Sequence, residues 1–151
     1  EKKDSGVLPI THKKMTRFSI TLKEGVEFVL DSLSRMWGGE IFVPKIPSYK
    51  IVDVVKAISE KAKTKVVGIR PGEKLHEQMI SEEDALYTYE YNDYYKILPV
   101  INNWSTSTNR IKKGKKVAEG FSYTSNNNSE WMSVEALQKW ITRNNGEIDN
   151  I

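Results

Sequence analysis

The sequence predicts an α/β fold with a small sheet, because two kinds of apolar pattern alternate along its 151 residues. Short apolar runs bounded by glycine or proline are typical of strands, whereas apolar residues spaced three and four apart predict helices. A capping box at Thr21 and Glu24 marks the start of the first helix. Strands that interleave with helices in this way place the chain in the α/β class.

The first half of the chain alternates short strands with two amphipathic helices. The side chains of Thr21 and Glu24 can each satisfy a backbone donor at the start of the first helix, and Gly38-Gly39 ends it. Ser48 is expected to cap the second helix, because serine accepts well from the first turn. The predicted elements are a strand over 15–20, a helix from Thr21 to Gly38, a strand over 40–43, a helix after Ser48 and a strand over 65–69.

The second half is predicted to contain a hairpin and a final helix. Two tyrosine-rich runs are separated by Asn92-Asp93, which is the spacing and chemistry of a hairpin turn. Ser81 and Ser133 are expected to cap helices. The predicted elements are helical turns over 73–80 and after Ser81, strands over 87–91 and 94–98, a polar loop over 102–116, a turn over 126–128 and a helix after Ser133.

Bulk composition describes one ordinary globular domain, with 38% hydrophobic and 28% charged residues. We expect residues 1–143 to form this domain and residues 144–151 to fray. The absence of cysteine excludes disulfides and thiolate metal sites and suits a cytoplasmic protein. No apolar run reaches the roughly 20 residues of a membrane span. The chain does not begin with methionine, and we expect it to be part of something longer.

The stretch from residue 67 to residue 77 carries the strongest functional signal. An apolar, β-prone run ends there in a charged turn, Arg70-Pro71-Gly72-Glu73. Proline and glycine force a sharp turn, while the planar guanidinium of Arg70 suits a phosphate. The Glu73 carboxylate can accept from sugar or ribose hydroxyls. The stretch therefore predicts a clamp for a nucleotide-sugar.

Arg17 is a second candidate ligand for the same diphosphate. It lies just before a helix whose N-terminus favours anions. Arg17 and Arg70 would each supply charge-assisted hydrogen bonds of about 1.5–3 kcal/mol. A surface arginine that only contacts solvent is the alternative at both positions.

The sequence contains no complete catalytic set. His76-Glu77 begins a metalloprotease-like motif, but Ile80 stands where the second histidine belongs, so no zinc site is expected. The nine glycines never fall as Gly-x-Gly-x-x-Gly, and no tyrosine is followed four residues later by lysine. The basic run over 112–116 is the feature that favours nucleic acid, yet it lacks interleaved aromatic residues and is expected to be a solvated loop.

Three motifs together resemble one enzyme family. They are Met15-Thr16-Arg17-Phe18, Ile46-Pro47-Ser48 and the stretch from Gly68 to Glu77. With them, the chain resembles the C-terminal, substrate-binding part of the UDP-N-acetylglucosamine 4,6-dehydratases, which are extended short-chain dehydrogenase/reductases. Residues 126–132 resemble the inverting members that start pseudaminic acid synthesis. The resemblance covers nearly all of residues 7–141.

The resemblance implies a small substrate-binding lobe that lacks the Rossmann domain of the full enzyme. That domain would bind NADP and carry the catalytic residues, so it is the expected missing partner and this chain alone is expected to be inactive. Arg17 and Arg70 would contact the diphosphate or ribose of a UDP-sugar, and Glu73 the ribose hydroxyls. The alternatives are a non-catalytic interaction module that forms a homo-oligomer, and the substrate lobe of a related epimerase or reductase.

Overall fold

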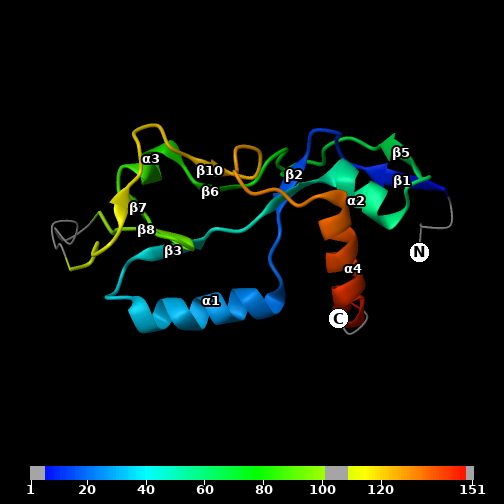
Figure 1. Ribbon diagram of the computed structural model, residues 1–151. Coiled ribbons are helices and arrows are strands. Elements are labelled where there is room, and N and C mark those ends of the chain that lie inside the picture. The colour runs from blue at the N-terminus through cyan, green and yellow to red at the C-terminus, as the bar shows by residue number, and fades with distance from the viewer. Residues whose placement is uncertain (1–5, 101–108, 149–151) are drawn as a thin grey trace. The chain divides into compact units, whose positions relative to one another are not determined.

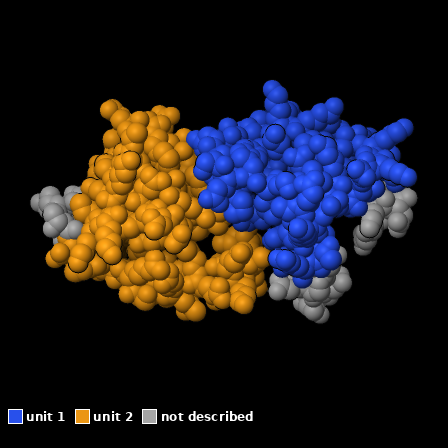
Figure 2. Space-filling model, in the orientation of Figure 1, with its two compact units in different colours: residues 1–19, 47–77, 125–151 blue, residues 20–46, 78–124 orange. Residues whose placement is uncertain are grey.

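The computed structural model describes residues 6–100 and 109–148, and the chain divides into two compact units (Figures 1 and 2). Unit 1 comprises residues 1–19, 47–77 and 125–151, and unit 2 comprises residues 20–46 and 78–124. Each unit is therefore assembled from segments that are far apart in the sequence. The mixed α/β class predicted from the alternating patterns is confirmed.

Unit 1 is built on two small sheets and two helices. Strand β1 (Val7–Ile10) pairs in parallel with β5 (Lys63–Val66), and β2 (Thr16–Phe18) pairs antiparallel with β4 (Ser48–Lys50). Helix α2 (Ile51–Ile58) packs on helix α4 (Val134–Ile148). The buried apolar side chains of this unit are Ile10, Met15, Val55 and Leu137.

The prediction that Ser48 caps the second helix is wrong. Ser48 lies in β4 and is fully buried, and α2 begins three residues later with no side-chain cap. The backbone N–H of Ser48 donates to the Glu130 carbonyl, its own carbonyl accepts from the Met132 N–H, and its hydroxyl accepts from Asn128. These long-range partners hold residues 128–132 against β4 and leave the hydroxyl no capping role.

Unit 2 contains a four-stranded antiparallel sheet in the order β3-β8-β7-β9. The predicted hairpin is confirmed, because β7 (Thr88–Glu90) pairs antiparallel with β8 (Tyr94–Ile97). Strand β3 (Ile41–Pro44) covers one edge, β9 (Lys115–Lys116) covers the other, and β6 (Gln78–Ile80) pairs separately with β10 (Tyr123–Thr124). The buried apolar side chains are Val43, Ile80, Ala85, Tyr95, Ile97, Leu98 and Tyr123.

Three of the four predicted helix caps, at Thr21, Ser81 and Ser133, are confirmed. Helix α1 (Leu22–Arg35) begins with the predicted capping box of Thr21 and Glu24, and the backbone and side-chain hydrogen bonds from Thr21 lower the pKa of Glu24. Ser81 caps the short helix α3 (Glu82–Ala85), and the Ser133 hydroxyl accepts from the Ala136 N–H at the start of α4.

Helix α4 continues to Ile148, beyond the point at which the sequence predicts fraying. The predicted loop over 102–116 falls partly outside the described residues, which resume at residue 109. Within the described ranges, none of the helices has the length and apolar character required to cross a bilayer.

Candidate functional site

The charged turn predicted after β5 is present in unit 1. The strand leaves its partner after the Val67 N–H donates to the Ile10 carbonyl. Gly68 then adopts φ +90° and Gly72 adopts φ +81°, two conformations that a residue with a Cβ rarely takes. The Glu73 N–H closes the turn by donating to the Arg70 carbonyl at 3.0 Å. The glycines thus allow the tight path that the sequence predicts.

Glu73 folds back onto its own turn. Its Oε2 accepts from the Arg70 backbone N–H at 3.1 Å, and its Oε1 accepts from the Thr11 hydroxyl at 3.5 Å. A carboxylate has about four acceptor sites, so two protein donors leave capacity for hydroxyl groups of a ligand. The carboxylate therefore fixes the turn and can still accept from a ribose.

The Arg70 side chain lies exposed at the tip of this turn. Among the described residues its guanidinium makes no hydrogen bond or ion pair. A turn with a fixed backbone and an unengaged guanidinium suits recognition of an anion, because only the Arg70 side chain loses conformational freedom when the ligand binds. The geometry is thus compatible with the predicted phosphate contact of Arg70.

Arg17 is placed differently, because its guanidinium binds the protein itself. Its Nη1 donates to the carbonyls of Thr16 (2.7 Å) and Leu75 (3.3 Å), and its Nη2 donates to the carbonyl of Lys74 at 2.9 Å. Its Nε lies 3.3 Å from Oε1 of Glu77. These bonds tie β2 to the segment that follows the Arg70 turn.

The same contacts explain why the helical turns predicted over 73–80 do not form. The carbonyls of Lys74 and Leu75 accept from Arg17, and Leu75 also accepts from the Thr16 N–H at 3.2 Å. Carbonyls held by a neighbouring strand are poorly placed to build a helix. Since the guanidinium has five N–H groups and four are directed at protein acceptors, one hydrogen on Nη2 remains for a ligand.

A chain of side-chain hydrogen bonds joins Thr16 of β2, His76 of the 70–77 segment and the buried Ser125. Thr16 Oγ1 is 2.7 Å from Nδ1 of His76 and 2.6 Å from Oγ of Ser125, and that Oγ accepts from the Glu77 N–H. If Ser125 donates to Thr16 and Thr16 donates to His76, the hydroxyl groups of Thr16 and Ser125 both have an acceptor. In that arrangement Nδ1 of His76 accepts and Nε2 carries the hydrogen. The reverse direction would leave the fully buried Ser125 hydroxyl without an acceptor among these partners.

Tyr49 lies opposite Arg17 in the β2–β4 pair. Burial raises the pKa of its phenol, and the nearby Arg17 charge opposes that rise. The phenol therefore stays neutral at physiological pH.

A family model described as "Polysaccharide biosynthesis protein" matches residues 1–99, about two thirds of the chain. This chain belongs to that family. Curated relatives agree with the assignment: the UDP-N-acetylglucosamine 4,6-dehydratase (inverting) of Campylobacter jejuni is 49% identical over 92% of this chain. The match covers 43% of that relative, in its C-terminal part, so the chain spans less than half the length of the curated relatives it matches.

Other proteins that match this chain are less similar to it. The UDP-glucose 4-epimerase of Rickettsia canadensis is 33% identical over 91% of this chain and 41% of its own length. Among solved structures, the X-ray structure of Pen from Bacillus thuringiensis superimposes with a TM-score of 0.73 at 24% identity, over 94% of this chain and 41% of that one. This last likeness shows the fold.

The sequence predicts Arg17, Arg70 and Glu73 as site residues. The structure places Arg17 in contact with the 70–77 segment that contains Arg70 and Glu73. The sequence does not predict the Thr16–Ser125 contact, which joins residues 109 positions apart and has no local signal. In the part of the chain that the structure describes, no group of three or more histidines and carboxylates is placed to hold a metal ion.

Proposed function

We propose that this chain is the UDP-sugar-binding part of an inverting UDP-N-acetylglucosamine 4,6-dehydratase, and that it is catalytically incomplete alone. The observation that carries the proposal is the turn over 70–73, which presents an unengaged guanidinium beside a carboxylate with spare acceptor capacity. The 49% identity to the Campylobacter enzyme supports the choice of sugar nucleotide.

In this proposal Arg70 binds the diphosphate and Glu73 accepts from the ribose hydroxyls. Arg17 holds the segment in place and adds one hydrogen bond through its remaining Nη2 hydrogen. The full enzyme would make precursors of bacterial surface polysaccharides or flagellin glycans, specifically of pseudaminic acid. It would act in the cytoplasm.

The residues of this chain do not fit a dinucleotide. No Gly-x-Gly-x-x-Gly turn occurs in the sequence, and no Tyr-x-x-x-Lys pair is present to act on C4 of the sugar. We therefore assign NADP and the proton-transfer residues to a partner domain that this sequence does not include.

The proposal predicts that Arg70→Ala weakens UDP binding by about tenfold, because a hydrogen bond to a charged group contributes about 1.5–3 kcal/mol and Arg70 is exposed, which favours the low end of that range. Calorimetric titration of UDP into the chain measures this. Lys74→Ala is the matched control, since Lys74 is an exposed cation on the same segment, and it should bind UDP as before.

Equal UDP affinity in the Arg70→Ala and unsubstituted chains would contradict the role of Arg70. Incubation of the chain alone with UDP-N-acetylglucosamine and NADP should give no 4-keto-6-deoxy product. Formation of that product would contradict the view that catalysis needs another domain.

A second function, as an oligomerisation module, is favoured by one observation on unit 2. Helix α1 buries none of its residues, and its apolar stripe stays exposed; for example, Leu30 is 62% and Leu33 59% exposed. A groove of about 300 Å³ runs between this helix and β3, lined by residues such as Phe28 and Phe42. Contiguous apolar surface of this kind drives association.

This alternative predicts that the isolated chain self-associates at micromolar concentration and that Leu30→Lys with Leu33→Lys restores a monomer. Sedimentation velocity across a concentration series measures the outcome. The control is Lys23→Glu, an exposed change on the polar side of the same helix. A chain that stays monomeric at all concentrations would contradict the oligomerisation function.

A further inference from the structure

Ser125 makes a fully buried contact with the end of the 70–77 segment. Its N–H donates to the Glu77 carbonyl at 2.8 Å, and its Oγ accepts from the Glu77 N–H at 2.9 Å. One residue therefore satisfies both backbone groups of Glu77. Backbone groups that lose water on folding need such partners, so this pair of bonds fixes the path of the chain at residue 77.

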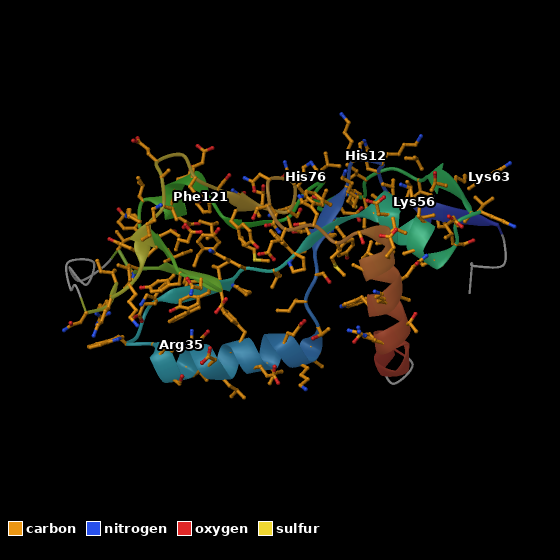
Figure 3. The ribbon with its side chains drawn as sticks, viewed as in Figure 1. His12, Arg35, Lys56, Lys63, His76 and Phe121 are labelled. Carbon is orange, nitrogen blue, oxygen red and sulfur yellow. The ribbon has the colours of Figure 1, made fainter. Side chains whose placement is uncertain are left out.

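Thr16 holds the same segment at the two preceding residues. Its backbone N–H donates to the Leu75 carbonyl at 3.2 Å, and its hydroxyl oxygen lies 2.7 Å from Nδ1 of His76. Only 4% of Thr16 is exposed, so water competes little for these groups. Figure 3 shows His76 on the segment that precedes β6. Residues 75, 76 and 77 are thus each held by a hydrogen bond to Thr16 or Ser125.

The hydroxyl groups of Thr16 and Ser125 act together, because their oxygens lie 2.6 Å apart. Ser125 Oγ accepts from the Glu77 N–H and donates to Thr16, and Thr16 then donates to His76, which carries its own hydrogen on Nε2. Loss of the Thr16 hydroxyl would leave Nδ1 of His76 without its donor. Loss of the Ser125 hydroxyl would leave the Glu77 N–H without its acceptor.

The residues held in this way follow directly on the Arg70 turn. Arg17 binds the carbonyls of residues 74 and 75, and the two hydroxyl groups bind residues 76 and 77. Ser125 is 0% exposed, so it cannot contact a ligand itself. A change at Ser125 can therefore alter ligand binding only through the residues that it holds.

We propose that Thr16 and Ser125 are positioning residues of the UDP-sugar site, whose hydroxyl groups hold the 70–77 segment in the conformation that binds the diphosphate and the ribose. This role rests on the proposed function of Arg70 and Glu73. The apparent affinity of a site falls in proportion to the fraction of molecules in the binding conformation. A loosened segment therefore binds UDP more weakly even when every residue that contacts the ligand is present.

Two substitutions of Thr16 separate the effect of its hydroxyl from the effect of its shape. Thr16→Val keeps the shape and removes the hydroxyl, whereas Thr16→Ser keeps the hydroxyl and removes a methyl group. Calorimetry should show that Thr16→Val weakens UDP binding by about tenfold, while Thr16→Ser stays within about twofold of the unsubstituted chain. Ser125→Ala should weaken UDP binding by a factor similar to that of Thr16→Val.

Thr88→Val is the matched control, because Thr88 is a fully buried threonine of unit 2 whose hydroxyl donates to the Asp84 carbonyl at 2.7 Å. It should lower stability and bind UDP as before. NMR of the ring nitrogens gives a second readout, since it distinguishes the two forms of a neutral histidine. The Nε2–H form of His76 should dominate in the unsubstituted chain and in Thr16→Ser, but not in Thr16→Val. The signals of His12, the other of the two histidines, should stay the same.

Arg70→Ala separates the positioning role from the proposed function, because it should weaken UDP binding while His76 keeps its Nε2–H form. If Arg70→Ala weakens UDP binding but Ser125→Ala and Thr16→Val do not, the positioning role is wrong and the proposed function stands. Equal UDP affinity in Thr16→Val and Thr16→Ser would also overturn the positioning role, because the hydroxyl would then make no difference. Absence of UDP binding by the unsubstituted chain at about 1 mM would overturn both proposals.

Discussion

Replacing Glu40 by alanine is expected to lower the free energy of unfolding of unit 2 by about 3–5 kcal/mol, the range for breaking a buried charge pair from one side. The Glu40 side chain has no solvent exposure. Its two carboxylate oxygens accept from the Trp37 N–H at 3.2 Å, and Oε2 accepts from the Gly38 N–H at 2.7 Å. The Arg110 guanidinium lies 3.9 Å from Oε1 and covers the Trp37 ring at 5.6 Å.

The substitution therefore removes several partners at once. The turn between α1 and β3 loses the acceptor for two backbone donors, and a nearly buried arginine loses its counter-charge. Burial already lowers the pKa of Lys96, while the charge of Glu40 opposes that effect. Loss of Glu40 should accordingly lower the pKa of Lys96 further, which an NMR titration can detect.

Urea unfolding, together with hydrogen exchange of the amides in unit 2, measures the destabilisation. Glu40→Gln keeps an acceptor of the same shape without the charge. Its free energy of unfolding should therefore lie between that of the unsubstituted chain and that of Glu40→Ala. Glu27→Ala, an exposed acid on α1, should change stability by no more than about 0.5 kcal/mol. An equal effect of the Glu27 and Glu40 substitutions would refute the argument.

The features that the sequence predicts correctly depend on local chemistry. The caps at Thr21, Ser81 and Ser133 each need a hydroxyl and a backbone N–H three residues later, which is a relation that the sequence displays directly. The hairpin around Asn92-Asp93 likewise depends on a turn and its two flanking runs. The α/β class likewise follows from a local pattern, the spacing of apolar residues along each strand and helix.

The features that the sequence mispredicts depend on distant partners. Ser48 has the right chemistry for a cap, but Glu130, Met132 and Asn128 occupy its hydrogen-bonding groups from about 80 residues away. The segment after Glu73 has helical character, but Arg17 takes two of its carbonyls. In both places tertiary hydrogen bonds outweigh local propensity, which amounts to under about 1 kcal/mol for ordinary residues.

The candidate site shows the same division. The residue types at Arg70 and Glu73 and the turn between them were predictable, because glycine and proline define the backbone there. The hydrogen bonds of the Arg17 guanidinium were not predictable, because no sequence pattern near residue 17 indicates that the carbonyls of residues 74 and 75 lie beside it. A sequence pattern identifies an arginine; only the fold shows what its guanidinium already binds.

Arg17→Ala is expected to cost about 2–3 kcal/mol of stability in unit 1 and also to weaken UDP binding, because the lost bonds hold the 70–77 segment in place. The Arg17 side chain is only 20% exposed, so water replaces these donors incompletely. Arg70→Ala removes an exposed side chain with no partner among the described residues, and it should weaken UDP binding without loss of stability. Chemical unfolding and UDP calorimetry on the two variants measure this contrast.

Arg17→Lys sharpens the comparison, since a single ammonium cannot reach three carbonyls and a carboxylate in the geometry of a planar guanidinium. It should recover only a small part of the lost stability although the charge is kept. If Arg17→Lys restored full stability, the guanidinium hydrogen bonds to residues 74 and 75 would contribute nothing to the free energy of unfolding. If instead Arg17→Ala impaired UDP binding while stability stayed unchanged, Arg17 would act only as a direct ligand of the diphosphate, and the positioning role assigned to it would be wrong.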